Sequence, residues 1–333
     1  MIDISDIKAA HKRIKPYINE TPVLSSSLLN QWLGHEIYFK AETLQKIGAF
    51  KARGGCNAVQ VLKEKHKNIK RVVANSSGNH AQAVAWASRE FGVPATIYMP
   101  SFASKVKAQA TRSYGAEVVL LDTRQEVDAA VEKAAQDEGV FCISPFNDYS
   151  VIAGQGTATL EALQQIDPPV DAVFTPCGGG GLISGSLVAT RHLQPRAKVI
   201  AVEPKAADDA MRSFETGQIQ HLNEAPNTLA DGAMTLSIGE KTFEHIRHLD
   251  DFYTVEETPI AYWTQWLQHI LKLHVESTCA MTMDGVCQWL RKQDQPKRVM
   301  VVLSGGNIDT LMMQNLWQKD YLNQQPSTEL FSK

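Results

Sequence analysis

The sequence lacks several features that would place the protein in a particular class. It has no apolar run of the length that a membrane-spanning helix requires. Its five cysteines are an odd number without a CxxC pair, which fits neither a disulfide framework nor a zinc site. Asp3, Asp6 and Lys8 stand where a secretory signal would have its apolar core. We therefore expect reduced cysteines, no membrane partner and a cytoplasmic location.

A large excess of charge of one sign is also absent. Lysine and arginine number 33 against 36 aspartates and glutamates, so the formal net charge is −3. The chain thus has no broad basic field for a phosphate backbone, and we expect no nucleic-acid partner. A hydrophobic fraction of 44% with 21% charged residues is typical of a folded globular protein. The 333 residues suffice for two domains or one large α/β unit.

Short β-branched runs alternate with longer helical patterns through most of the chain. This alternation is typical of βαβ units with a parallel sheet, so the predicted fold class is α/β. The expected strands are 36–40, 71–74, 95–98, 116–120, 171–175, 198–203 and 299–303. The expected helices are 51–64, 79–92, 104–114, 124–138, 181–193 and 261–273. In such folds ligands bind where a strand hands over to a helix.

Three glycine-containing loops occur at such positions. The tetraglycine loop Gly178-Gly179-Gly180-Gly181 leaves backbone N–H groups bare before a helix and suits one phosphate, with a flexible turn as the alternative. The stretch Ser76-Ser77-Gly78-Asn79-His80 carries polar groups into the same crevice, or is simply an N-capping turn. The third loop, Ser304-Gly305-Gly306-Asn307, puts a hydroxyl at the end of a strand.

Lys51 lies at the mouth of an expected helix, between Phe50 and Ala52. Most lysines at such positions are solvated. An apolar setting, however, lowers the pKa of the amine, which then acts as a nucleophile that forms Schiff bases and moves protons. The combination of this lysine with the three loops indicates more than any one motif.

Phe50-Lys51, the stretch 76–80, Gly154-Gln155-Gly156-Thr157, the tetraglycine loop and the stretch 304–307 occur in the order known from one family. From Thr21 to Asn307 the chain resembles the fold-type II pyridoxal-phosphate enzymes of the serine/threonine dehydratase and serine racemase family. The resemblance implies two open, twisted α/β domains, like those of the tryptophan synthase β-subunit, with the cofactor in the cleft between them. It implies a large domain of residues 1–45 and 146–323, a small mobile domain of residues 46–145, a tail of residues 324–333, and a homodimer.

The resemblance also implies a role for each motif. Lys51 would bind pyridoxal 5'-phosphate covalently and serve as the catalytic base, with Phe50 beside the pyridine ring. Asn79 would meet the cofactor's 3′-oxygen and Ser304 its pyridine nitrogen. Its phosphate would be held by the backbone N–H groups of Gly178, Gly179, Gly180, Gly181 and Leu182. The substrate carboxylate would be gripped by Ser76, Ser77, Asn79 and His80.

A metal site is implied as well. Residues matching Glu203, Asp209 and the carbonyl of Ala207 bind Mg²⁺ or Ca²⁺ in the family, and hard oxygen ligands suit such ions. The alternative is that these carboxylates are solvated charges at the start of a helix.

The activity that the resemblance implies is loss of the β-hydroxyl from L-threonine or L-serine, giving a 2-oxo acid and ammonia. A hydroxyl such as that of Ser304 at the pyridine nitrogen makes a milder electron sink than a carboxylate, which suits elimination. The small hydroxy-amino acid 3-hydroxyaspartate is another candidate substrate. Ser77 keeps open an amino-acid racemase with dehydratase side activity, because two opposed proton carriers invert a stereocentre. A non-catalytic cofactor carrier is the alternative from another class, although it would need neither Lys51 nor Ser77.

Two segments depart from the family pattern. Ala49 stands where serine is common, and Glu276-Ser277-Thr278-Cys279-Ala280 replaces a Glu-Pro-Ser/Thr-x-Gly pattern. The methyl group of Ala280 is expected to narrow the site or tilt Glu276, which leaves the substrate preference open.

Overall fold

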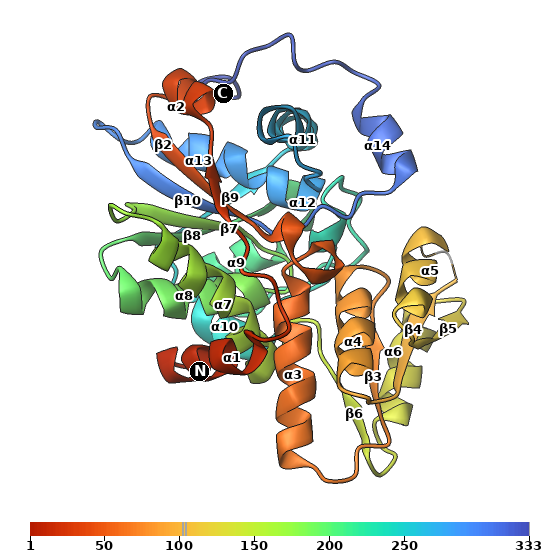
Figure 1. Cartoon of the computed structure of the whole chain (residues 1–333). Helices are drawn as coiled ribbons and strands as arrows, with labels where there is room; N and C mark the ends of the chain where they lie inside the picture. The colour runs from red at the N-terminus through yellow and green to blue at the C-terminus, as the bar shows by residue number, and fades with distance from the viewer. Residues whose placement is uncertain (102, 104, 333) are drawn as a thin grey trace.

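The computed structural model describes residues 1–101, 103 and 105–332 (Figure 1). Residue 104 of the helix expected over 104–114 and residue 333 of the expected tail lie outside the described residues. Two separate sheets organise the chain, and we call them the large sheet, with six strands, and the small sheet, with four. The predicted α/β class is confirmed.

The large sheet has the order β1-β2-β10-β7-β8-β9, and only β1 runs antiparallel to its neighbour. Its strands are β1 (Val23–Ser25), β2 (Glu36–Ala41), β7 (Ala172–Pro176), β8 (Lys198–Pro204), β9 (Asp251–Val255) and β10 (Arg298–Leu303). Residues 299–303 of β10 are all fully buried, as expected for a parallel strand covered on both faces. In register, Val299 lies opposite Ile37 of β2 and Ala172 of β7. The carboxyl ends of these three strands therefore meet at one edge.

The small sheet is entirely parallel and has the order β5-β4-β3-β6. Its strands are β3 (Arg71–Asn75), β4 (Ala95–Pro100), β5 (Glu117–Leu121) and β6 (Val140–Cys142). In Figure 1 this sheet, coloured orange to yellow, lies to one side of the large sheet with α4, α5 and α6. Both sheets thus supply strand ends from which loops can face each other.

The helices have these bounds: α1 (Ile4–Ile14), α2 (Ser27–Leu33), α3 (Lys51–Lys65), α4 (Asn79–Glu90), α5 (Lys105–Ser113), α6 (Arg124–Ala134), α7 (Tyr149–Gln165), α8 (Gly181–Leu193), α9 (Asp209–Thr216), α10 (Glu240–Ile246), α11 (Glu257–Leu271), α12 (Ser277–Ala280), α13 (Thr282–Leu290) and α14 (Thr310–Leu316). Short 3-10 segments are η1 (Glu42–Leu44), η2 (Lys46–Gly48), η3 (Lys205–Ala207) and η4 (Asp231–Ala233). Every expected strand and helix is present, with ends that differ by a few residues. The predicted domain limits at residues 46 and 145 stay a prediction.

Helix α3 packs between α4 and α7, and so lies between the parts of the chain that hold the two sheets (Figure 1). Glycines allow this close packing. A Cβ atom on Gly154 of α7 would come within 2.7 Å of the carbonyl oxygen of Arg53, and one on Gly156 within 2.9 Å of that of Gly185 in α8. The sequence analysis did not predict the helix α7. Its glycines do not break the helix; they allow α3 and α8 to pack closely against it.

A buried network of four charged side chains fixes the start of α3. Arg53 donates to Glu42 at 2.7 Å and to Glu161 of α7 at 2.7 Å, and Lys40 of β2 donates to Glu161 at 3.0 Å. None of the four side chains is more than 4% exposed. Because each carboxylate meets a cation, the network joins α3 to β2 and α7 without leaving a buried charge unpaired.

Among the helices that the structure describes, none combines the length and the apolar character needed to cross a membrane.

Candidate active site

The predicted site residues follow strands of both sheets. The strand β10 leads into Ser304, β7 into the tetraglycine loop, and β3 into the stretch 76–80. Lys51 is the first residue of α3, and the main-chain N–H of Phe50 before it donates to the carbonyl of Ser304 at 2.9 Å. The start of α3 is therefore held directly on the end of β10.

Lys51 is half-buried, and its amine contacts the main chain of the segment that precedes α7. Its Nζ atom donates to the carbonyl oxygen of Pro145 at 2.7 Å and lies 5.2 Å from the centroid of the Phe50 ring. Burial lowers the pKa of Lys51 to about 8, although the negative charge of Glu276 opposes this shift. The amine is therefore neutral for a far larger fraction of the time near neutral pH than that of an exposed lysine.

Glu276 links the predicted site residues Asn79 and Ser304. Its carboxylate accepts from Asn79 Nδ2 at 3.1 Å and from Ser304 Oγ at 3.4 Å, and the residue is 3% exposed. Burial and the nearby charge of Asp231 raise the pKa of Glu276 to about 7. A Cβ atom on Gly305 would lie 2.7 Å from the carboxylate, so a side chain at this position would displace Glu276. Asn79 is held from the other side by Asn307, whose Nδ2 donates to its Oδ1 at 2.8 Å.

The loop 178–182 presents unpaired donors at a helix N-terminus. In the described part of the chain, none of the N–H groups from Gly178 to Leu182 donates a hydrogen bond. Gly180 caps α8 with a φ of 89°, a left-handed conformation that favours glycine, and no side chain caps the helix. Buried N–H groups without partners are costly, and an anion at this N-terminus would satisfy them. The residues present therefore fit a phosphate.

The N-terminus of α4 opens without a side-chain cap as well. The hydroxyl of Ser76 accepts from the N–H of Gly78 at 3.2 Å, whereas that of Ser77 makes no hydrogen bond within the described chain. His80 is buried, and its Nε2 lies 2.8 Å from the carbonyl of Ile143. Burial and the charge of Lys51 lower the pKa of His80 to about 3, so the imidazole is neutral. This N-terminus suits a carboxylate, and His80 brings no charge of its own.

Glu203, near the end of β8, and Asp209, at the start of α9, form a pair of buried acids. Glu203 accepts from the N–H of Met211 at 2.6 Å, while Asp209 Oδ2 has no partner among the described residues. Burial raises the pKa of Glu203 and raises that of Asp209 to about 7. The described residues contain no group of three or more histidine, cysteine or acidic side chains that could hold a metal ion. An ion here would need main-chain oxygens such as that of Ala207, and the unpaired carboxylate oxygen fits a divalent cation.

Several residues of the site were missed by the sequence analysis. Asn307 stands in a recognised motif and Glu276 in a segment noted for its departure, but no role was predicted for either. Lys107 of α5 and Asp231 of η4 form an ion pair at 2.5 Å, and no local pattern links residues this far apart. Ala280 is fully buried in the apolar core beside the large sheet.

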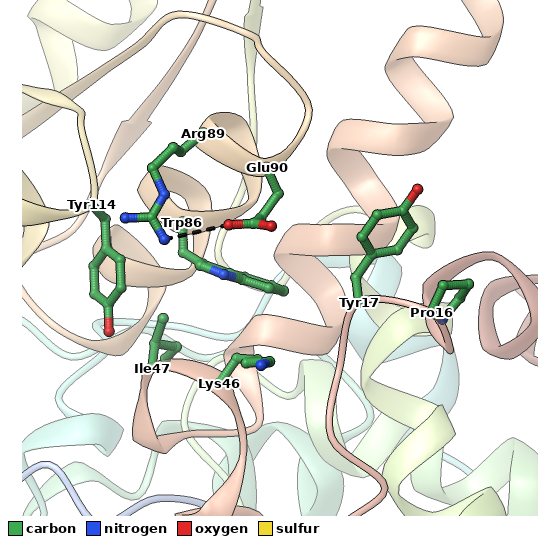
Figure 2. A pocket seen from close by; sticks show the side chains of 8 residues that line it. All are labelled: Pro16, Tyr17, Lys46, Ile47, Trp86, Arg89, Glu90 and Tyr114. Carbon is green, nitrogen blue, oxygen red and sulfur yellow. Dashed lines mark hydrogen bonds and ion pairs between the residues drawn. The ribbon is translucent and has the colours of Figure 1, made fainter.

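A separate surface cavity of about 420 Å³ opens beside η2 and α4 (Figure 2). Its lining includes Lys46, Trp86 and Tyr114, and Arg89 pairs there with Glu90 at 3.3 Å. No predicted site residue lines this cavity, so it is distinct from the predicted site around Lys51.

Comparison with known proteins identifies relatives along nearly the whole chain. The sequence matches the family described as pyridoxal-phosphate dependent enzyme over residues 14–305. It is 44% identical over 307 residues to the L-threo-3-hydroxyaspartate ammonia-lyase of Saccharomyces cerevisiae, covering 91% of this chain and 93% of that protein. It is 41% identical over 312 residues to the serine racemase of Dictyostelium discoideum, covering 92% and 95%. The solved structure of the T.th. threonine deaminase superimposes with a TM-score of 0.87 at 41% identity, covering 92% of this chain and 99% of that one. These relatives catalyse different reactions, so the reaction of this chain has to be inferred from its own residues.

Proposed function

This chain belongs to the pyridoxal-phosphate dependent enzymes of fold type II, and we propose that it is an ammonia-lyase that removes the β-hydroxyl group from a small L-hydroxy-amino acid. The candidates are L-threo-3-hydroxyaspartate, L-serine and L-threonine. The observation that carries the proposal is the half-buried amine of Lys51, whose pKa is lowered to about 8 where the ends of β10 and α3 meet. The name of the S. cerevisiae relative supports the reaction type.

The residues present suit the cofactor. The free N–H groups from Gly178 to Leu182 would hold the phosphate, Asn79 the 3′-oxygen and Ser304 the pyridine nitrogen, with Phe50 beside the ring. When bound, pyridoxal phosphate supplies an electron sink that acidifies the α C–H bond of an amino acid.

Each group of the chain would then have a separate role in proton transfer, substrate binding or cofactor binding. Lys51 Nζ takes the α-proton, since an amine with a pKa near 8 is well matched to proton transfer near neutral pH. The N-terminus of α4, with Ser76, Ser77, Asn79 and the neutral His80, binds the substrate carboxylate. The hydroxyl of Ser304 offers the pyridine nitrogen no carboxylate partner, which favours elimination over reactions that need a long-lived carbanion.

The test is turnover of the cofactor-loaded protein on each of the three substrates, followed by release of 2-oxo acid. We expect activity in the unaltered protein and in Lys46→Ala, which removes an exposed lysine near the start of α3. In Lys51→Ala we expect activity to fall by at least about 10³-fold, because both the covalent attachment and the base are lost. Substantial activity in Lys51→Ala would contradict the assignment.

A racemase is the second candidate, because the Ser77 hydroxyl is not engaged in any described hydrogen bond and a serine racemase is 41% identical. A second proton carrier opposite Lys51 would return the α-proton to the other face. Chiral analysis of the remaining L-serine tests this. Loss of D-serine formation in Ser77→Ala, with 2-oxo acid release retained, would support the racemase; absence of D-serine from the unaltered protein would remove it.

We also propose Mg²⁺ or Ca²⁺ at Glu203, Asp209 and the carbonyl of Ala207. The unpaired Asp209 Oδ2 and the burial of both carboxyl groups support it, because a cation would stabilise the charged form of two buried acids that form no ion pair among the described residues. Such an ion would stabilise the junction of β8 with α9 and take no part in proton transfer.

A homodimer and a cytoplasmic location remain expectations from the resemblance and the sequence. Light scattering during gel filtration tests the first by comparing the solution mass with that of one chain. Fluorescence microscopy of a tagged protein tests the second.

A further inference from the structure

We infer that Lys107 binds a second carboxylate of the substrate and so determines a preference for a dicarboxylic hydroxy-amino acid over L-serine. This inference rests on the proposed function and narrows its substrate class. The lysine lies on α5, beside the small sheet, and reaches across to Asp231 of η4, on the chain that follows β8 of the large sheet. Only 18% of its side chain is exposed. Lys107 is therefore held at the junction of the two parts of the molecule.

The segment η4 brings this ion pair next to the tetraglycine loop. A Cβ atom on Gly178 would lie 3.1 Å from both the carbonyl oxygen of Gly232 and the Cα of Ala233, so η4 packs on the phosphate-binding loop. The same segment also contacts α12, because the N–H of Gly232 donates to Thr278 Oγ1 at 2.9 Å. Thr278 stands two residues after Glu276 in the sequence. The segment that holds Asp231 thus lies between the tetraglycine loop and the start of α12, and the charge of Glu276 acts on Lys107.

The charged side chains around Glu276 favour Lys107 as the group that binds a second substrate carboxylate. Glu276 and Asp231 are acidic, and a substrate with a second carboxylate would meet repulsion from both. The charge of Glu276 acts to raise the pKa of both Lys51 and Lys107, so both amines lie near this carboxylate. Lys51 is committed to the cofactor and the α-proton, which leaves Lys107 as the cation for the distal carboxylate. Burial acts to lower the pKa of Lys107, but the carboxylates of Asp231, Glu276 and Asp309 together outweigh it, so the pKa is raised and the amine stays charged.

Exchange of one carboxylate for another is the physical step. In the unliganded protein the amine of Lys107 forms its ion pair with Asp231, which is exposed. A dicarboxylic substrate would replace Asp231 and make the same charge-assisted hydrogen bond, while the displaced aspartate returns to water. L-serine has no group that can make this exchange.

The test compares Lys107→Gln with a matched control, Arg112→Gln, which removes one positive charge from the exposed end of the same helix. With cofactor-loaded protein, kcat/KM is measured for L-threo-3-hydroxyaspartate and for L-serine. We expect the ratio of the two values to fall by about 10- to 100-fold in Lys107→Gln and to stay unchanged in Arg112→Gln. In Asp231→Asn, which frees the amine, the ratio should rise.

Binding of L-aspartate and L-alanine, which lack a leaving group, gives a readout independent of turnover. Titration calorimetry should show the L-aspartate affinity of Lys107→Gln weakened by about 10-fold or more relative to that for L-alanine. An equal loss for both ligands, or no loss, would overturn the inference and leave Lys107 as a contact between α5 and η4. If the unaltered protein released no 2-oxo acid, the proposed function would fail, while the L-aspartate to L-alanine ratio would still decide the role of Lys107.

Discussion

Lys51 has to be neutral to attack an aldehyde, and two opposing influences set the pH at which this happens. Burial lowers its pKa to about 8 and Glu276 raises it. We predict that capture of pyridoxal phosphate by cofactor-free protein rises with pH about a midpoint near 8, well below the 10.5 of an ordinary lysine. Glu276→Gln removes the charge that favours the ammonium form, so its midpoint should move to lower pH.

The measurement is the rate at which Schiff-base absorbance appears across a pH series. Glu90→Gln, an exposed acid on α4, serves as the control and should keep the original midpoint. A midpoint that stays in place or moves upward in Glu276→Gln would show that Glu276 does not act on the amine.

Residues that stand in local motifs could be proposed as site residues from the sequence, whereas residues that only burial brings beside them could not. Lys51, Asn79 and Ser304 stand in short sequence patterns. In the structure Asn79 and Ser304 donate hydrogen bonds to one carboxylate, and the charge of that carboxylate also acts on Lys51. That carboxylate, Glu276, was not predicted as a site residue because the fold alone buries it beside these groups, and burial is a property of the whole chain. Lys107 pairs with Asp231 across 124 positions of sequence, a separation at which no pattern is readable.

At the scale of elements, the network around Arg53 decides how firmly α3 is held. Arg53→Met leaves Glu42 without its arginine partner and deprives Glu161 of one of its two cations, all in a site at most 4% exposed. We predict a loss of about 3–5 kcal/mol in the free energy of unfolding, because a buried charge without its partner is strongly unfavourable. Urea unfolding followed by circular dichroism measures it.

Arg196→Met, an exposed position after α8, removes the same charge and should cost no more than about 0.5 kcal/mol. Similar losses of stability in the two variants would mean that Arg53 contributes no more through the buried network than an exposed arginine does through its charge.

For some of the elements that escaped prediction, the structure gives a physical reason. Helix α7 carries Gly154 and Gly156, which weaken a helical pattern locally but permit contact with α3 and α8. The strands β1 and β6 span three residues each, too few to show an alternation. Longer strands such as β10 were predicted because their apolar runs are continuous and bounded by turns.

At the scale of the whole molecule, the proposed metal ion should contribute to stability. A ligand that binds the folded chain raises its melting temperature, by the equivalent of about 2.7 kcal/mol at a concentration 100 times the dissociation constant. We therefore predict that a chelator lowers the Tm and that added Mg²⁺ or Ca²⁺ restores it. In Asp209→Asn neither treatment should change the Tm. A Tm that is indifferent to chelator in the unaltered protein would exclude a stabilising ion at Glu203 and Asp209.

The strand order of the large sheet has a consequence for biosynthesis. β2 ends at residue 41 but lies beside β10, whose first residue is 298, so it has no parallel neighbour until the ribosome has made most of the chain. The strands of the small sheet, within residues 71–142, pair only with one another and can assemble long before that. Ser304 follows β10 and is among the last of the site residues to emerge. A nascent chain can thus carry a finished small sheet while the crevice around Lys51 still awaits its final strand.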